Sequence, residues 1–178
     1  MSSFFYFAYG SNLLRERILL NNPSAVFVAI AQLKNYALQF CAKSVEGEDG
    51  RWAGGTANII EADGDSVWGV VWELDRKHQE SLDKQEEVNK NVYRRLENLR
   101  VTTLAPLAGN RSELECTCYQ FIEPVTVLPS PQYLTIIQTG ARQQQLPDEY
   151  QRVLASIKHN GYQGPLPLFD QIMASVKL

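Results

Sequence analysis

Four residues near the start of the chain, Tyr9-Gly10-Ser11-Asn12, join a strand-like apolar run to a helical pattern. The run Phe4–Ala8 predicts a strand, and the leucines and Ile18 between Leu13 and Leu20 recur at helical spacing. A strand, a tight glycine turn and a helix start leave several backbone N–H groups unpartnered and aim them at one small volume. This order of elements predicts a cradle for a carboxylate or a developing oxyanion.

The same residues also fit a plain helix start. Gly10 lets the backbone turn sharply and approach a ligand closely, and either Ser11 or Asn12 can cap the helix that follows. Glycine, serine and asparagine serve turns and caps in most proteins. Their types alone therefore leave an anion site and a simple cap both open.

A second group that could do chemistry is acidic. Glu80, Asp83, Glu86 and Glu87 lie on or just after a charged segment with a helical pattern. A carboxylate beside an anion cradle could carry a proton, and partial burial would raise its pKa toward neutrality. Such a charge run is more commonly a solvated helix face, so the residue types do not choose among the four.

The Tyr9–Asn12 loop after an aromatic strand resembles the signature loop of the γ-glutamylcyclotransferase family, whose members release 5-oxoproline from γ-glutamyl compounds. The resemblance covers about residues 4 to 162 and is closest to the type that acts on γ-glutamyl-amino acids. Five further segments resemble the family in the same order: Val67–Trp72, Ser81–Glu86, Tyr93, Pro129–Tyr133 and Gly140-Ala141.

The resemblance implies a lyase-type cyclotransferase in which Glu86 is the proton carrier. It implies that backbone N–H groups of the loop hold the substrate's carboxylate and γ-carbonyl oxygen, with Ser11 and Asn12 fixing the loop's shape. Tyr93 and Tyr133 would orient Glu86 or the substrate. The substrate-binding residues expected from the resemblance are Tyr9, Gly10, Ser11, Asn12, Leu13, Tyr93 and Tyr133.

The implied reaction needs little machinery, because the nucleophile belongs to the substrate. The α-amine of a γ-glutamyl compound attacks its own γ-carbonyl, closes a five-membered lactam and expels an amine. Tethering of this kind can be worth about 7–11 kcal/mol when the bound pose is a near-attack conformer. The protein has to take a proton from the α-ammonium group, stabilise the tetrahedral oxyanion and return a proton to the leaving nitrogen, so no cofactor is expected.

The chain departs from the family pattern directly after the proposed base. The family has a small residue there, whereas this chain has Glu87, which we expect to point outward while Val88 returns the chain to the core. This departure leaves a second hypothesis open, a non-catalytic γ-glutamyl-binding or anion-binding regulatory protein. A third is a cyclotransferase for glutathione or γ-glutamyl amines.

Composition agrees with a small-molecule enzyme. The chain has 178 residues, a formal net charge of −3 and no basic stripe, so neither nucleic acid nor an anionic membrane is an expected partner. It lacks a signal-peptide pattern and any apolar run near the roughly 18 residues that span a bilayer, which predicts a cytoplasmic protein. The resemblance allows a homodimer, although no sequence pattern decides the oligomeric state.

Cysteine and histidine give no sign of redox or metal chemistry. Cys116 and Cys118 are two apart in an expected strand and are interpreted as packing residues. His78 and His159 lack ligand spacing, so no metal is expected. Gly54-Gly55 predicts a strand bulge or a close backbone contact rather than a phosphate loop.

The elements that must position these residues predict an α+β fold. Apolar runs bounded by turns predict strands at 25–31, 36–41, 53–60, 67–74, 92–104 and 114–122. The resemblance implies that they form one small curved mixed sheet with a barrel-like core, flanked by helices, in a single domain spanning residues 1–178.

Helices are expected from a cap at Asp75 to about Glu86, from Pro131 to about Thr139 with a stop at Gly140, and over 147–158. Ala108–Asn110 predicts a hairpin turn, and 43–50 predicts a mobile loop. Residues 163–178 are expected to form a loosely attached tail with about one helical turn. Either this tail or the loop 43–51 is a candidate cover for the site.

Overall fold

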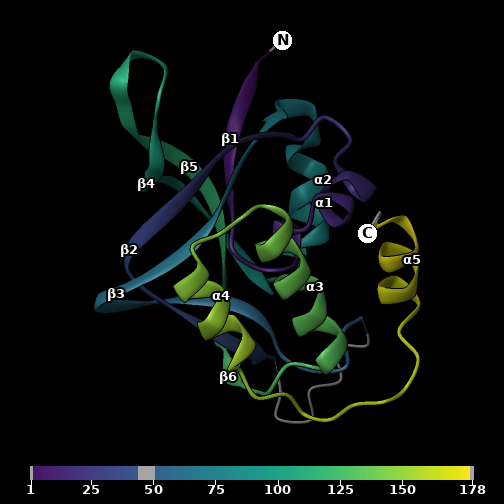
Figure 1. The fold of residues 1–178 in the computed structure, drawn as a ribbon. Helices are drawn as coiled ribbons and strands as arrows, with labels where there is room; N and C mark the ends of the chain where they lie inside the picture. Colours follow the sequence, from purple (N-terminus) through teal and green to yellow (C-terminus); the bar gives the residue numbers. More distant parts are fainter. Residues whose placement is uncertain (1, 44–50, 177–178) are drawn as a thin grey trace.

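The computed structural model describes residues 2–43 and 51–176, in which helices pack around one curved mixed sheet (Figure 1). The sheet order is β3-β1-β5-β4-β2-β6, and β3 also pairs with β2. This arrangement confirms the predicted α+β class. The strands are β1 (Ser3–Ala8), β2 (Val26–Ala42), β3 (Thr56–Asp75), β4 (Tyr93–Leu107), β5 (Arg111–Phe121) and β6 (Val125–Thr126).

The pairing runs from β3 through β1, β5, β4 and β2 and returns to β3. Two of these strand pairings are short. Strands β1 and β5 pair in parallel through one residue pair, Tyr6↔Thr117, and β2 and β4 pair through two residue pairs. The sheet is therefore strongly curved without being a fully laddered barrel. The β4–β5 hairpin extends away from it (Figure 1), and its turn lies at Ala108–Asn110, as predicted. Gly109 in this turn has a φ of 75°.

Two of the strands are longer than the sequence predicts. The expected strands 25–31 and 36–41 are one strand, β2, and the expected 53–60 and 67–74 are likewise one strand, β3. The register between them shifts at Lys34/Tyr36, where Asn35 and Gly64 both have positive φ. A polar bulge thus interrupts the apolar pattern without ending either strand. Strand β6 was not predicted at all.

The helices differ from prediction mainly at their ends. Asp75 makes no capping hydrogen bond; a 3₁₀ turn, Arg76–His78, precedes α2. Ser130 does cap α3, accepting from the Tyr133 N–H, but Gly140 lies inside that helix rather than ending it. The α-helices in the described residues are α1 (Arg15–Asn21), α2 (Gln79–Gln85), α3 (Pro131–Gln143), α4 (Asp148–Ala155) and α5 (Pro167–Ser175).

The C-terminal segment is more firmly attached than expected. Helix α5 has nine residues, and Leu166 and Ile172 are almost completely buried, with Ile172 in the core cluster. Helix α5 lies against α1 and α3 (Figure 1). The expected mobile loop falls outside the described residues apart from Lys43. No helix in the described part of the chain is long and apolar enough to cross a membrane.

Candidate active site

The loop Tyr9–Asn12 connects β1 to a 3₁₀ turn, Ser11–Leu13, which precedes α1. No side chain caps this turn or α1, so the predicted cap by Ser11 or Asn12 is wrong. The Leu13 N–H donates to the Gly10 carbonyl at 3.0 Å and the Leu14 N–H to Ser11 at 3.1 Å. Leu13, one of the expected substrate-binding residues, therefore already uses its N–H in a hydrogen bond within the loop.

Asn12 holds the loop in place from three sides. Its Nδ2 donates to the Tyr6 hydroxyl at 3.0 Å, and its Oδ1 accepts from Gln85 Nε2 at 3.1 Å. Its backbone carbonyl accepts from Trp72 Nε1 at 3.0 Å. The side chain is buried, and these bonds connect β1, β3 and α2 to the loop. Asn12 therefore makes the contacts expected of a residue that fixes the loop's shape.

Close backbone contacts explain why two glycines belong to the pattern. A Cβ on Gly69 would lie 2.3 Å from the Ala8 carbonyl oxygen, so this glycine lets β3 pack against the end of β1. A Cβ on Gly140 would lie 2.5 Å from the Leu14 nitrogen. Helix α3 therefore continues through Gly140 because the glycine lets the loop lie directly on the helix. Gly54 and Gly55 approach backbone in the same way, as predicted.

Glu86 ends α2 and is aimed by a tight reversal. Its N–H donates to the Leu82 carbonyl at 2.9 Å, and the next residue, Glu87, is left-handed at φ 51° and ψ 39°. The Val92 N–H then returns to the Glu87 carbonyl at 3.3 Å, and Val88 packs against the core. The turn separates the two neighbouring glutamates, and Glu86 faces the loop.

The electrostatics around Glu86 favour its neutral form more than water does. Burial raises the pKa of its carboxyl from 4.5 to about 7, and the nearby Glu87 charge adds to the rise. Arg17, Arg51 and a hydrogen bond from Gln85 Nε2 at 3.3 Å oppose it. A carboxyl that titrates near neutral pH can both accept and return a proton.

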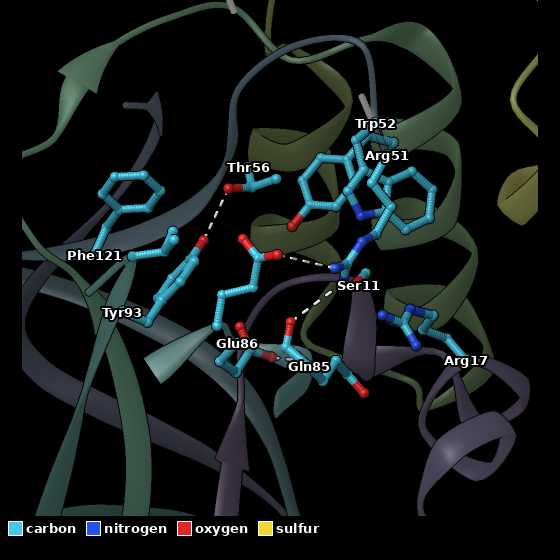
Figure 2. A pocket seen from close by; sticks show the side chains of 12 residues that line it. Ser11, Arg17, Arg51, Trp52, Thr56, Gln85, Glu86, Tyr93 and Phe121 are labelled. Atoms are coloured by element: carbon cyan, nitrogen blue, oxygen red, sulfur yellow. Dashed lines mark hydrogen bonds and ion pairs between the residues drawn. The ribbon is translucent and has the colours of Figure 1, made fainter. Parts of the chain in front are cut away.

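Glu86 lines both an open pocket of about 280 Å³ (Figure 2) and an inner cavity of about 40 Å³. Ser11, Tyr93 and Tyr133 line both spaces, whereas Leu13 lines neither. The inner cavity is also lined by Tyr6, Tyr9, Gly10, Asn12, Ala57 and Tyr119, and the open pocket by Arg17, Arg51, Trp52, Thr56, Gln85, Glu87, Val92 and Phe121.

This geometry agrees with what comparison with known proteins finds. Residues 66–154 match the model of the AIG2-like family. A γ-glutamylcyclotransferase from Bos taurus is 46% identical over 163 residues, which cover 91% of this chain and 82% of that protein. One from Mus musculus is 43% identical and covers 92% and 84%. The chain belongs to the γ-glutamylcyclotransferase family.

A solved structure shows that the whole fold is shared with this family. A structure described as a γ-glutamyl cyclotransferase superposes with a TM-score of 0.88 at 40% identity, covering 98% of this chain and 100% of that one. The overlap includes the curved sheet, the loop after β1 and the helices that flank it. The resemblance inferred from the sequence is therefore confirmed.

The two expected pocket tyrosines bind the backbone of one residue in this cyclotransferase. The Ala57 N–H donates to the Tyr133 hydroxyl at 3.1 Å, and the Tyr93 hydroxyl donates to the Ala57 carbonyl at 3.0 Å. Tyr133 also accepts from the Ser11 backbone, and burial raises its pKa to about 12. Tyr133 thus stays protonated and keeps its own O–H for a ligand. The expected direct bond from either tyrosine to Glu86 is not among the hydrogen bonds of the described residues.

Glu87, the residue that departs from the γ-glutamylcyclotransferase pattern, does not simply point outward as expected. It lines the open pocket at its rim, 2.8 Å from Lys90 Nζ and 3.7 Å from Arg51 Nη2. The hydrogen bond from Lys90 lowers its pKa, so Glu87 stays ionised while Glu86 titrates. Its left-handed backbone gives a physical reason for a small residue at this position, because side chains disfavour positive φ.

Several pocket residues were missed by the sequence argument: Arg17, Arg51, Trp52, Thr56 and Gln85. Arg17 could have been found, because it follows Leu13 by four positions and Leu14 by three, on the apolar face of its helix. Arg51 and Trp52 come from a loop and Thr56 from a strand start, where no periodicity marks the direction of a side chain. Gln85 is the last residue of α2, on a charged segment where polar residues usually face solvent.

The cysteines behave as packing residues. Cys116 and Cys118 are buried, and burial raises the pKa of both thiols, that of Cys116 to about 12. A thiol in such surroundings is a poor nucleophile. Among the described residues, no three His, Cys, Asp or Glu side chains gather as metal ligands would.

Proposed function

We propose that this γ-glutamylcyclotransferase acts as a single domain on γ-glutamyl-amino acids and releases 5-oxoproline and the free amino acid. The observation that carries the proposal is the Glu86 carboxyl, which faces the pocket beside the Tyr9–Asn12 loop with a pKa of about 7. Family membership supplies the reaction type, and this carboxyl supplies the acid and base that the reaction needs.

In the proposed reaction, ionised Glu86 accepts a proton from the substrate's α-ammonium group. The freed amine attacks the γ-carbonyl carbon, a C–N bond forms, and the carbonyl electron pair moves onto oxygen. As the oxyanion collapses, the bond to the leaving nitrogen breaks and that nitrogen takes the proton from Glu86. The attacking nitrogen still carries one proton more than a lactam does, and it gives this proton to the regenerated Glu86 carboxylate. That second proton then passes to the released amine, so Glu86 carries both protons that the α-ammonium group loses.

The oxyanion would lie against the loop between β1 and α1. The Tyr133 hydroxyl accepts two backbone N–H groups, which polarises its own O–H for donation. We assign this O–H and the N–H groups of Gly10 and Asn12 to the oxyanion and the substrate. Removing one such donor typically costs a factor of 10² to 10³ in turnover. Gln85 keeps the loop and the base in register by bonding both Asn12 and Glu86.

The test is 5-oxoproline release from γ-glutamyl-alanine, with glutathione and the two γ-glutamyl-lysine isomers assayed in parallel. Glu86→Gln should lower turnover by at least about 100-fold, because general acid–base catalysis is worth that much or more. The variant should still bind 5-oxoproline. If wild type binds γ-glutamyl ligands without turning any over, the non-catalytic hypothesis replaces this one; a preference for glutathione or the ε-linked lysine isomer would change the substrate class.

Two further expectations belong to the proposal. We expect a cytoplasmic location, and fractionation of cells that express the chain would test it. A homodimer is allowed by the family resemblance, and sedimentation equilibrium of the purified chain would decide it.

A further inference from the structure

Arg17 is a buried cation for which the described residues provide no ion-pair partner. Only 2% of its surface is exposed, and its Nε and Nη1 have no hydrogen-bond partner among the described residues. No carboxylate in the described part of the chain lies within 4 Å of it. Its guanidinium nevertheless lines the open pocket with Ser11 and Glu86 (Figure 2).

Such an arrangement is costly unless an anion completes it. Burial of an unpaired charge destabilises a fold, and burial lowers the pKa of Arg17, although arginine remains protonated. Glu86 is the charge that most favours the guanidinium, but the two do not form an ion pair. The guanidinium therefore places a positive charge at the pocket wall, and two of its nitrogens have no partner among the described residues.

The substrate carries two carboxylates, and their positions relative to Glu86 differ. The α-carboxylate shares its carbon with the ammonium group that must reach Glu86, so it has to enter the pocket with the reacting atoms. The carboxylate of the leaving amino acid lies beyond the scissile bond, toward the variable end of the substrate. Arg51, with 42% of its side chain exposed and its charge shared with Glu87, lies at the rim, where that variable end would emerge.

We propose that Arg17 binds the α-carboxylate of the γ-glutamyl group, and of the product 5-oxoproline, by a two-pronged hydrogen-bonded ion pair. The inference rests on the proposed function, which supplies the substrate. A planar guanidinium fork matches a carboxylate in a way that a lysine ammonium does not. Arg17 would then select γ-glutamyl compounds from other γ-amino acyl amides.

The test compares two substrates that differ only at this carboxylate. γ-Glutamyl-alanine carries it, whereas 4-aminobutanoyl-alanine has hydrogen there and cyclises to 2-pyrrolidinone and alanine. Wild type should prefer the first in kcat/KM by about 100-fold, as expected for a charge-assisted buried pair. In Arg17→Met the preference should fall below about 3-fold, because γ-glutamyl-alanine alone loses a partner.

Comparing the two substrates distinguishes binding of the α-carboxylate by Arg17 from an effect of the Arg17 charge on Glu86. Loss of the Arg17 charge also alters the pKa of Glu86, but both substrates need Glu86, so that effect cancels in the ratio. Arg15→Met is the matched control, because Arg15 lies on the same helix, is exposed and carries the same charge. This control should leave the preference unchanged.

A binding measurement makes the inference independent of turnover. Calorimetry should show that wild type binds 5-oxoproline at least about 30-fold more tightly than 2-pyrrolidinone, and that Arg17→Lys, which keeps the charge, loses most of this difference. If wild type turns over neither substrate, the proposed function fails while calorimetry still tests Arg17. The inference would be overturned if a folded Arg17 variant kept the preference for γ-glutamyl-alanine over 4-aminobutanoyl-alanine, or for 5-oxoproline over 2-pyrrolidinone. It would also be overturned if γ-glutamyl-alaninamide, which lacks the leaving carboxylate, were insensitive to the Arg17 substitution, because Arg17 would then bind that carboxylate instead.

Discussion

Glu86→Gln should stabilise the folded protein at alkaline pH while it lowers turnover by at least about 100-fold. The folded state raises the pKa of Glu86 from 4.5 to about 7, so the folded protein holds this proton more tightly than the unfolded chain does. The stability contributed by the protonated form is complete below about pH 4.5 and is lost as pH rises through about 7. Glutamine keeps the shape and hydrogen-bonding of the neutral form at every pH.

The size of the effect follows from the pKa. A rise from 4.5 to about 7 corresponds to about 3 kcal/mol of lost stability once Glu86 is fully ionised. Because the Glu86 side chain is only partly buried and lines an open pocket, we expect about 2 kcal/mol at pH 8 and about 1 kcal/mol at pH 5.5. The advantage of the variant should therefore grow by about 1 kcal/mol between these pH values.

Urea unfolding of wild type and variant at pH 5.5 and pH 8 measures this difference. The pH dependence of the unfolding free energy that comes from all other titratable groups is the same in both proteins and cancels. Glu87→Gln is the matched control, because Lys90 lowers the pKa of Glu87 and the sign is reversed. That variant should be less stable than wild type at both pH values by no more than about 1 kcal/mol, and it should retain turnover. An advantage of Glu86→Gln that is absent, or equal at both pH values, would refute the buried-base reasoning.

Three further outcomes are expected. Tyr133→Phe should lower kcat of γ-glutamyl-alanine turnover by about 100-fold with a smaller change in KM, because it removes a donor to the oxyanion; an equal loss for binding of 5-oxoproline would contradict that role. Gly140→Ala should raise KM and cost about 2 kcal/mol in urea unfolding, because its Cβ would meet the Leu14 nitrogen. Ile172→Ala should cost about 3 kcal/mol, and an unchanged midpoint would show that α5 contributes nothing to the fold.

Local chemistry explains which elements the sequence predicts well. The apolar run before Tyr9 forms β1, Ser130 followed by Pro131 starts α3, and Gly109 turns the β4–β5 hairpin. Each depends on residues adjacent in the chain, whose preferences are the same in peptides and in folded proteins. The sequence predicts two short strands in place of β2 and two in place of β3, because a polar bulge interrupts the apolar periodicity in the same way as the end of a strand does.

The sequence by itself determined the family, the strand–loop–helix order around Tyr9–Asn12 and the presence of an acidic residue able to serve as a base. It did not choose Glu86 from its acidic neighbours without the resemblance, since all lie on one charged segment. Only the tertiary structure decided that Gly140 continues its helix, that α5 is docked and that Arg17 is buried beside the pocket. The same holds for the raised pKa of Glu86, because burial and long-range charges arise when segments far apart in the chain pack together.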